Sequence, residues 1–135
     1  MGAILTAMLA MLLLAGPAAA VPTVVVANGN NSGPGSLRQA LEDVDPGGTV
    51  RIPASVSEIA LDTELVINKS LTIEGAGAGQ TAIDAQHHSR AMLVVGFPKV
   101  TVSGVQILDG EIAAEGGTIR GGGIFVNEGE LTLDR

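Results

Sequence analysis

The chain lacks cysteine, tryptophan and tyrosine altogether. Without cysteine it has no disulfide framework, so the packed core alone must hold the fold. Phe97 and Phe125 are its two aromatic residues. Carbohydrate-binding clefts commonly combine aromatic platforms with polar anchors. This scarcity therefore argues against a complete sugar site within these residues.

Basic residues are also scarce, since seven Lys and Arg stand against fourteen Asp and Glu and give a net charge of −7 at pH 7. A nucleic-acid-binding protein is expected to carry a basic patch. The composition therefore argues against nucleic acid as a partner. The acids are dispersed along the chain, as is usual for residues that keep a protein soluble.

The first twenty residues have the organisation of a secretion signal. An apolar run covers residues 3–15, Gly16-Pro17 interrupts it, and Ala18-Ala19-Ala20 supplies the small residues of a cleavage site. The run is too short for a comfortable membrane span, and no Lys or Arg precedes it. We therefore expect residues 1–20 to be a signal peptide, the protein to be secreted or on the cell surface, and no further membrane span. The alternative is an uncleaved amphiphilic anchor.

Three copies of a two-part strand unit follow the leader. Each copy contains an apolar triplet, a turn and an apolar-Thr-apolar strand. The middle threonines recur after 29 and then 31 residues, and a period in this range is the signature of a solenoid. The copies are Leu65–Asn68 with Leu71–Gly75, Leu93–Gly96 with Val100–Gly104, and Ile124–Asn127 with Leu131–Arg135.

Strand side chains alternate between two faces, so the apolar residues of each unit point one way and the threonine points the other. We therefore predict an all-β parallel β-helix with an inward apolar row and an outward threonine ladder. One unit cannot bury its apolar face without the next. A β-sandwich is the competing fold, whereas leucine-rich-repeat spacing is absent. The two rows are Leu71-Val100-Leu131 and Thr72-Thr101-Thr132.

Residues 21–53 differ from the repeats. Thr23–Ala27 has the pattern of a strand, and a helix is expected to start at Ser36, which has capping-box spacing to Gln39. Asp45–Gly48 ends this helix. The open end of a solenoid exposes core and strand edges, so the helix is predicted to cap it. Its apolar stripe is Leu37, Ala40, Leu41 and Val44.

Two expectations concern what is exposed. In the cap, Arg38 and Glu42 should face solvent while the apolar stripe is buried over the first coil. Residues 54–135 should form the first coils, and the third unit stops at Arg135 with no cap after it. We therefore expect an open C-terminal end, a longer natural protein, and self-association through that end.

The stretch Gly35–Leu41 resembles the CSLREA-type N-terminal domain, in which a Ser-Leu-Arg-Glu/Gln-Ala core precedes an NPGDTI turn and strand. That turn here reads Asp45–Val50, and Ile67–Gly77 is similar to the family's INKSLTIxGxG. The resemblance spans residues 23–135 and implies a right-handed parallel β-helix of the pectin-lyase-like kind, secreted and often on bacterial surfaces. Gly35 stands where the family name has a non-catalytic cysteine. Because family members are mostly large proteins of unassigned activity, the resemblance implies fold and location and no reaction.

Polysaccharide lyases and glycoside hydrolases on this fold need clustered or paired carboxylates, often with calcium or a basic residue. Asp109 and Glu111 flank Gly110 and suit a cation-binding turn, although a solvated turn is the favoured explanation. Carboxylates at one repeat position are interrupted by a serine. That row is Glu74, Ser103 and Asp134.

His87-His88 follow Asp84 in an expected loop, but no second ligand cluster has recognised metal spacing. Gly121–Gly123 lacks the Gly-Lys-Ser/Thr of a phosphate loop and is expected to permit a tight corner. Arg120 beside it could act as a base, but a lone arginine is far more often a solvated turn residue. We therefore predict no catalytic, cofactor-binding or metal-binding residue.

The sequence thus predicts a secreted or cell-surface β-helical scaffold of the adhesin-like kind, with no assignable reaction. Its expected partner is an extracellular polysaccharide or a cell-surface component. The alternative is the N-terminal part of a polysaccharide lyase or glycoside hydrolase whose active site lies on further coils.

Overall fold

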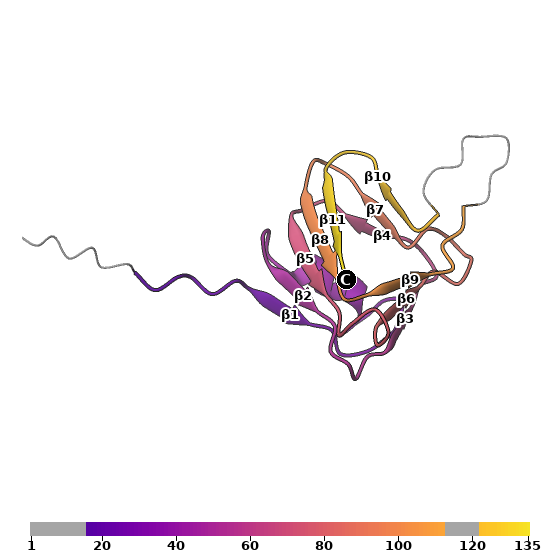
Figure 1. Cartoon of the computed structure of the whole chain (residues 1–135), viewed down its shortest axis with the longest axis horizontal. Helices are drawn as coiled ribbons and strands as arrows, with labels where there is room; N and C mark the ends of the chain where they lie inside the picture. Colours follow the sequence, from indigo (N-terminus) through magenta and orange to yellow (C-terminus); the bar gives the residue numbers. More distant parts are fainter. Residues whose placement is uncertain (1–15, 113–121) are drawn as a thin grey trace, which may run out of the picture.

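The computed structural model describes residues 16–112 and 122–135, and in these residues the chain winds into a parallel β-helix of about four turns (Figure 1). All strand pairs of the described residues are parallel. The predicted all-β solenoid is therefore confirmed, and the β-sandwich is excluded. Most of the predicted signal segment, residues 1–15, lies outside the described residues. Residues 16–22 lead away from the body as an exposed, extended stretch.

The five-stranded sheet carries both predicted rows in register. Leu71 pairs with Val100 and Val100 with Leu131, and the three threonines pair in the same way. The ladder is longer than predicted, because Thr23 and Thr49 continue it toward the N-terminus. In hydrogen-bonded order the strands are β1 (Thr23–Val25), β2 (Thr49–Arg51), β5 (Leu71–Glu74), β8 (Lys99–Ser103) and β11 (Glu130–Asp134).

Two three-stranded sheets complete each coil, so the coil has one strand more than the two-part repeat indicated. In the additional sheet Ile59 pairs with Ile83 and Ile83 with Ile107. These isoleucines are evenly spaced in the sequence, and that spacing was the signal for the third strand. The strands are β3 (Glu58–Ala60), β6 (Ala82–Asp84) and β9 (Gln106–Leu108), and β4 (Leu65–Ile67), β7 (Met92–Val94) and β10 (Ile124–Val126).

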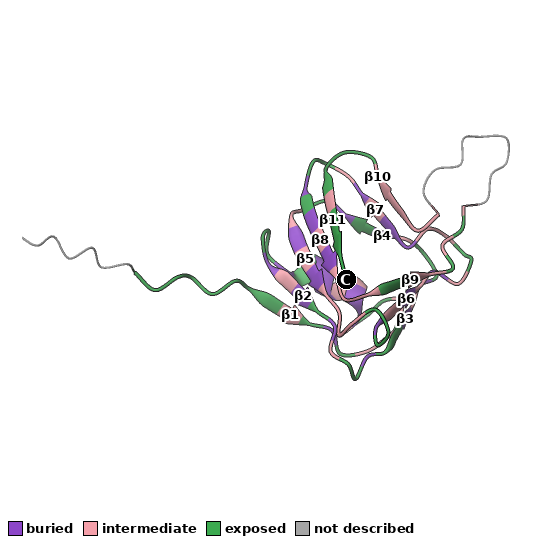
Figure 2. Ribbon diagram, in the orientation of Figure 1, coloured by how far each residue is buried: buried purple, intermediate pink, exposed green. Residues whose placement is uncertain are grey.

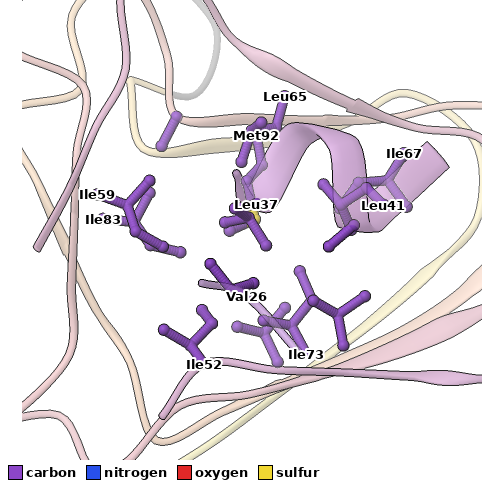
Figure 3. Close-up of a cluster of buried hydrophobic side chains, with 14 of the residues drawn as sticks. Val26, Leu37, Leu41, Ile52, Ile59, Leu65, Ile67, Ile73, Ile83 and Met92 are labelled. Carbon is purple, nitrogen blue, oxygen red and sulfur yellow. The ribbon is translucent and has the colours of Figure 1, made fainter. Parts of the chain in front are cut away.

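The core lies in the space that the three sheets enclose (Figure 2). Ile73, Ile83 and Met92, one from each sheet, are all 0% exposed. Figure 3 shows them converging beneath the helix with other aliphatic side chains. Burial of apolar surface contributes about 25 cal/mol per Å². This core continues from coil to coil and stabilises the fold of a protein that has no cysteine.

Helix α1 (Leu37–Asp43) packs against β1 and β2 at the N-terminal end. Its stripe is buried as predicted, since Leu41 is 6% and Val44 1% exposed. Ser36 Oγ accepts a hydrogen bond from the backbone N–H of Gln39 at 3.2 Å. The Gln39 side chain donates to Asp43 instead of returning to Ser36, so only half of the capping box forms. The predicted cap is present and begins at the expected residue.

The last turn of α1 is capped by a side chain from the first coil. Lys69 Nζ donates to the carbonyl oxygens of Glu42, at 2.9 Å, and Val44, at 2.6 Å. The final carbonyls of a helix have no partner within it, and a cation there also interacts favourably with the helix dipole. Lys69 therefore ties the helix to the turn that follows β4.

The prediction that Arg38 is exposed is wrong, because its side chain is half-buried. Its guanidinium donates to both the backbone and side-chain oxygens of Asn31 and of Thr63, and to the carbonyl oxygen of Glu64 at 2.8 Å. The planar fork of arginine can serve several acceptors at once. Arg38 thus joins the loop before the helix to the corner before β4.

The register predicted for the strand Leu93–Gly96 is also wrong, by one residue. In the structure β7 starts at Met92, which pairs with Leu65, and Leu93 pairs with the outward-facing Val66. A slip of one residue exchanges the faces of a strand, so Met92 is fully buried and Leu93 only partly.

The reason for this register is the corner that follows. Residues 95–98 form the corner after β7, which is one residue longer than the corner 68–70 after β4. Gly96 and Phe97 both have positive φ there, 82° and 61°. The number of residues between this strand and the threonine of the next strand therefore differs from coil to coil. For this reason the position of the threonine did not predict the register of β7.

Candidate functional site

The histidine pair and the acidic turn lie at one edge of the solenoid, where each coil turns from the β3-β6-β9 sheet to the β4-β7-β10 sheet. We refer to residues 61–64, 85–91 and 109–112 as the polar corner. Backbone hydrogen bonds join its second and third segments, from His87 N–H to Asp109 O at 2.9 Å and from Glu111 N–H to Ser89 O at 3.0 Å, and Leu61 N–H of the first segment donates to Asp84 O at 2.8 Å.

The backbone of the polar corner includes residues in the left-handed region. Gln86, His87 and Asp109 have φ values of 53°, 58° and 48°. Such conformations in non-glycine residues cost of the order of 1 kcal/mol each and persist where neighbouring structure enforces them. The hydrogen bonds between coils supply that constraint.

The two histidines reach toward different coils. His87 lies between two carboxylates of the following corner, with Nε2 3.6 Å from Asp109 and Nδ1 3.3 Å from Glu111. His88 Nδ1 lies 3.7 Å from Asp62 of the preceding corner. The histidine pair and the acidic turn, which the sequence presented as separate candidates, are therefore neighbours.

This arrangement does not suit a metal ion. The two acids contact opposite nitrogens of His87, so one ion cannot bind all three groups, and His88 faces the other way. Residues 16–112 and 122–135 contain no set of three or more His, Cys, Asp or Glu that could hold a metal. Asp84 is occupied locally, because its Oδ1 accepts the backbone N–H of Gln86 at 2.7 Å.

Arg90 is a member of the polar corner that the sequence reasoning missed. Its Nε lies 2.7 Å from Glu64 Oε2, and its guanidinium carbon lies 5.1 Å from the ring centre of Phe125. With the side chain only 21% exposed, this ion pair is better shielded than a usual surface pair. Arg90 and Glu64 form one wall of a cleft of about 380 Å³ that also includes Asp62, His88 and Glu111.

The remaining candidates stay apart from this edge. Glu74, Ser103 and Asp134 are aligned on the five-stranded sheet as predicted, and Glu74 forms an ion pair with Arg51 at 3.3 Å. Gly110 and Gly122 lie with their backbones in close approach, so a side chain at Gly122 would meet the Gly110 carbonyl. Two residues considered in the sequence, Arg120 and Gly121, lie outside the described residues.

The polar side chains of the polar corner mainly contact one another between neighbouring coils. Each charged group just described binds a group on a neighbouring coil, in the pairs Asp62 with His88, Glu64 with Arg90, and His87 with its two acids. No membrane-crossing helix occurs in the described part of the chain, where the helix has seven residues.

No protein-family model, curated protein or solved structure matches this chain. The likeness to the CSLREA-type domain therefore remains a resemblance carried by the motifs quoted above.

Proposed function

We propose that this protein is an exported β-helical scaffold of the adhesin-like kind that acts outside the cytoplasm. The observation that carries this proposal is the use of the polar side chains. Arg38, Lys69 and Arg90 all bind groups of another coil or of the cap, as do the histidines of the polar corner. Such contacts between coils stabilise the shape of the solenoid and suit a protein that presents an extended surface to a partner.

The five-stranded sheet is the surface that we propose to contact an extracellular polysaccharide or a cell-surface component. Its outward face carries the threonine ladder at the inter-strand spacing of about 4.8 Å. Ion pairs border the ladder on both sides, with Arg51 3.3 Å from Glu74 and Lys99 3.7 Å from Glu130. A regular, polar face of this kind offers repeated hydrogen-bonding positions to an extended polymer.

Export is tested with the 135-residue chain expressed in a bacterial host. We expect the protein outside the cytoplasm with Val21 as its first residue, as read by fractionation and intact-mass spectrometry. Ala20→Asp should prevent cleavage, whereas Ala54→Asp, which changes an exposed residue, should leave it intact. An uncleaved parent chain in the cytoplasm would refute the export proposal.

The enzymatic alternative is tested by incubating the purified protein with pectate and neutral polysaccharides, with and without calcium. We expect retention on some immobilised polysaccharides and no release of reducing or unsaturated ends. Turnover that Asp109→Asn or Glu111→Gln abolishes would replace the scaffold proposal with a carbohydrate-active enzyme.

A further inference from the structure

A groove of about 510 Å³ separates helix α1 from strand β4. The helix forms one wall and the strand with its following turn forms the other. Leu41 and Leu65 make the floor, and both are buried. The lining residues are Arg38, Leu41, Glu42, Leu65, Val66, Asn68 and Lys69.

The strand wall of the groove is an unpaired edge. Among the strands of residues 16–112 and 122–135, β4 is the terminal strand of its sheet and pairs only with β7. Leu65 donates its N–H to Ala91 O, and Ile67 O accepts from Val95, so both residues bond toward the β7 side. The N–H and C=O of one strand residue point to the same edge and those of the next residue to the opposite edge, so the N–H and C=O of Val66 point away from β7, on the side of the groove. None of the hydrogen bonds found among the described residues uses them.

The groove also holds cations that lack acidic partners. Arg38 and Lys69 bind only neutral oxygen atoms, and no carboxylate of residues 16–112 and 122–135 lies within 4.0 Å of either. Two carbonyls engage Lys69, and its ammonium has a third N–H. Glu42 is the one acid in the lining. In a protein with a net charge of −7, this groove is therefore locally cationic.

We propose that the groove binds an extended acidic peptide segment of a partner protein, added as a strand beside β4. The peptide backbone would bond to the N–H and C=O of Val66, and a carboxylate side chain would accept from Lys69. Val66, whose side chain is 52% exposed, offers an apolar contact to the next side chain of the peptide. An acidic polysaccharide could satisfy the cations but has no peptide backbone to pair with the edge. The site is independent of whether the protein is exported.

The binding test uses two synthetic peptides, acetyl-Thr-Val-Glu-Val-Glu-Val-Thr-amide and the same peptide with Lys in place of Glu. The amide resonances of the isotope-labelled protein are followed during each titration. We expect the acidic peptide to move the amide resonance of Val66 and to bind about 10-fold more tightly than the basic one, with the difference shrinking in salt. Absence of binding, or binding that leaves Val66 unaffected, would overturn the proposal.

Matched variants separate strand pairing from charge. Val66→Pro removes the edge N–H at a position where proline is tolerated, and Val66→Thr keeps it. We expect about a 10-fold loss of affinity for the proline variant, equivalent to one hydrogen bond, and little change for threonine. Glu42→Gln, at an exposed helix position, should tighten binding about 2-fold.

Two results would show that the groove recognises charge alone, and the proposal would then be wrong. One is that a folded Val66→Pro variant binds the acidic peptide as tightly as the parent protein. The other is that polygalacturonate competes with the peptide equally strongly in both Val66 variants. If the proline variant does not fold, the response of Val66 in the parent protein decides the question.

Discussion

Two side chains attach the N-terminal cap to the first coil. Arg38 near the start of α1 reaches the corner before β4, and Lys69 after β4 reaches the last carbonyls of the helix. Their acceptors would otherwise be partly buried carbonyl groups without partners, which costs about 1–3 kcal/mol for each group. Both residues lie in the stretches that resemble the CSLREA-type domain, and the structure gives these positions a mechanical role.

At this scale we predict that Arg38→Ala lowers the free energy of unfolding by about 2 kcal/mol, because hydrogen bonds from a charged donor to five oxygen atoms are lost. Arg38→Lys should recover little of this, since an ammonium group cannot replace the planar fork. Urea unfolding measures both variants. The control is Arg51→Ala, whose exposed ion pair should be worth less than about 1 kcal/mol. If Arg38→Ala and the control lost the same free energy of unfolding, the proposed role of Arg38 in attaching the cap would be wrong.

At the scale of elements, the register of β7 decides which side chains enter the core. β7 pairs with β4 and β10 on its two sides, so an error in its register would turn apolar residues outward in the middle of a sheet. Met92 pairs with Leu65 on one side and Ile124 on the other, which places it in a continuous inward row.

The register predicts different outcomes for two adjacent substitutions that introduce the same side chain. Met92→Thr removes buried volume and places a hydroxyl in the core, and should cost about 3 kcal/mol. Leu93→Thr, on the outward face, should cost less than about 1 kcal/mol because threonine suits a strand. Thermal and urea unfolding compare the two proteins. If Leu93→Thr lost more stability than Met92→Thr, the register predicted from the sequence, with Leu93 facing the core, would be the correct one.

At the scale of the whole molecule, the first and last described coils differ in what covers them. Helix α1 covers the core near β1 and β2, whereas β11 is an edge strand among the described strands and its Leu133 is 63% exposed. Leu133 borders a hollow of about 350 Å³ together with apolar residues of the preceding coil, Val102, Val105 and Ile107. An apolar hollow next to an unpaired strand edge favours association.

A polypeptide of residues 21–135 presents this edge, and we predict that it self-associates as its concentration rises, as measured by light scattering. Leu133→Lys should suppress association, because it puts a charge at the hollow. Thr132→Lys adds the same charge to the outward face and should have a smaller effect. A soluble monomer with a cooperative thermal transition would show that the edge does not drive association.

The local patterns of the sequence determined the class of fold and the character of its cap. Alternation around Thr72, Thr101 and Thr132 predicted the ladder, and helical spacing with Ser36 predicted α1, because these signals come from backbone geometry within a few residues. The evenly spaced isoleucines at Ile59, Ile83 and Ile107 mark the remaining strand of each coil, and this spacing is also a local pattern of the sequence.

Only the tertiary structure decided the contacts that cross between coils. No local pattern indicated that Arg38 would donate to Thr63 and Glu64, or that His87 would lie between Asp109 and Glu111. Such partners depend on how many residues each corner contains, and corners of different length moved the register of β7 as well. Local periodicity specifies which face a residue takes within its strand, whereas the stacking of coils determines which distant residue it meets.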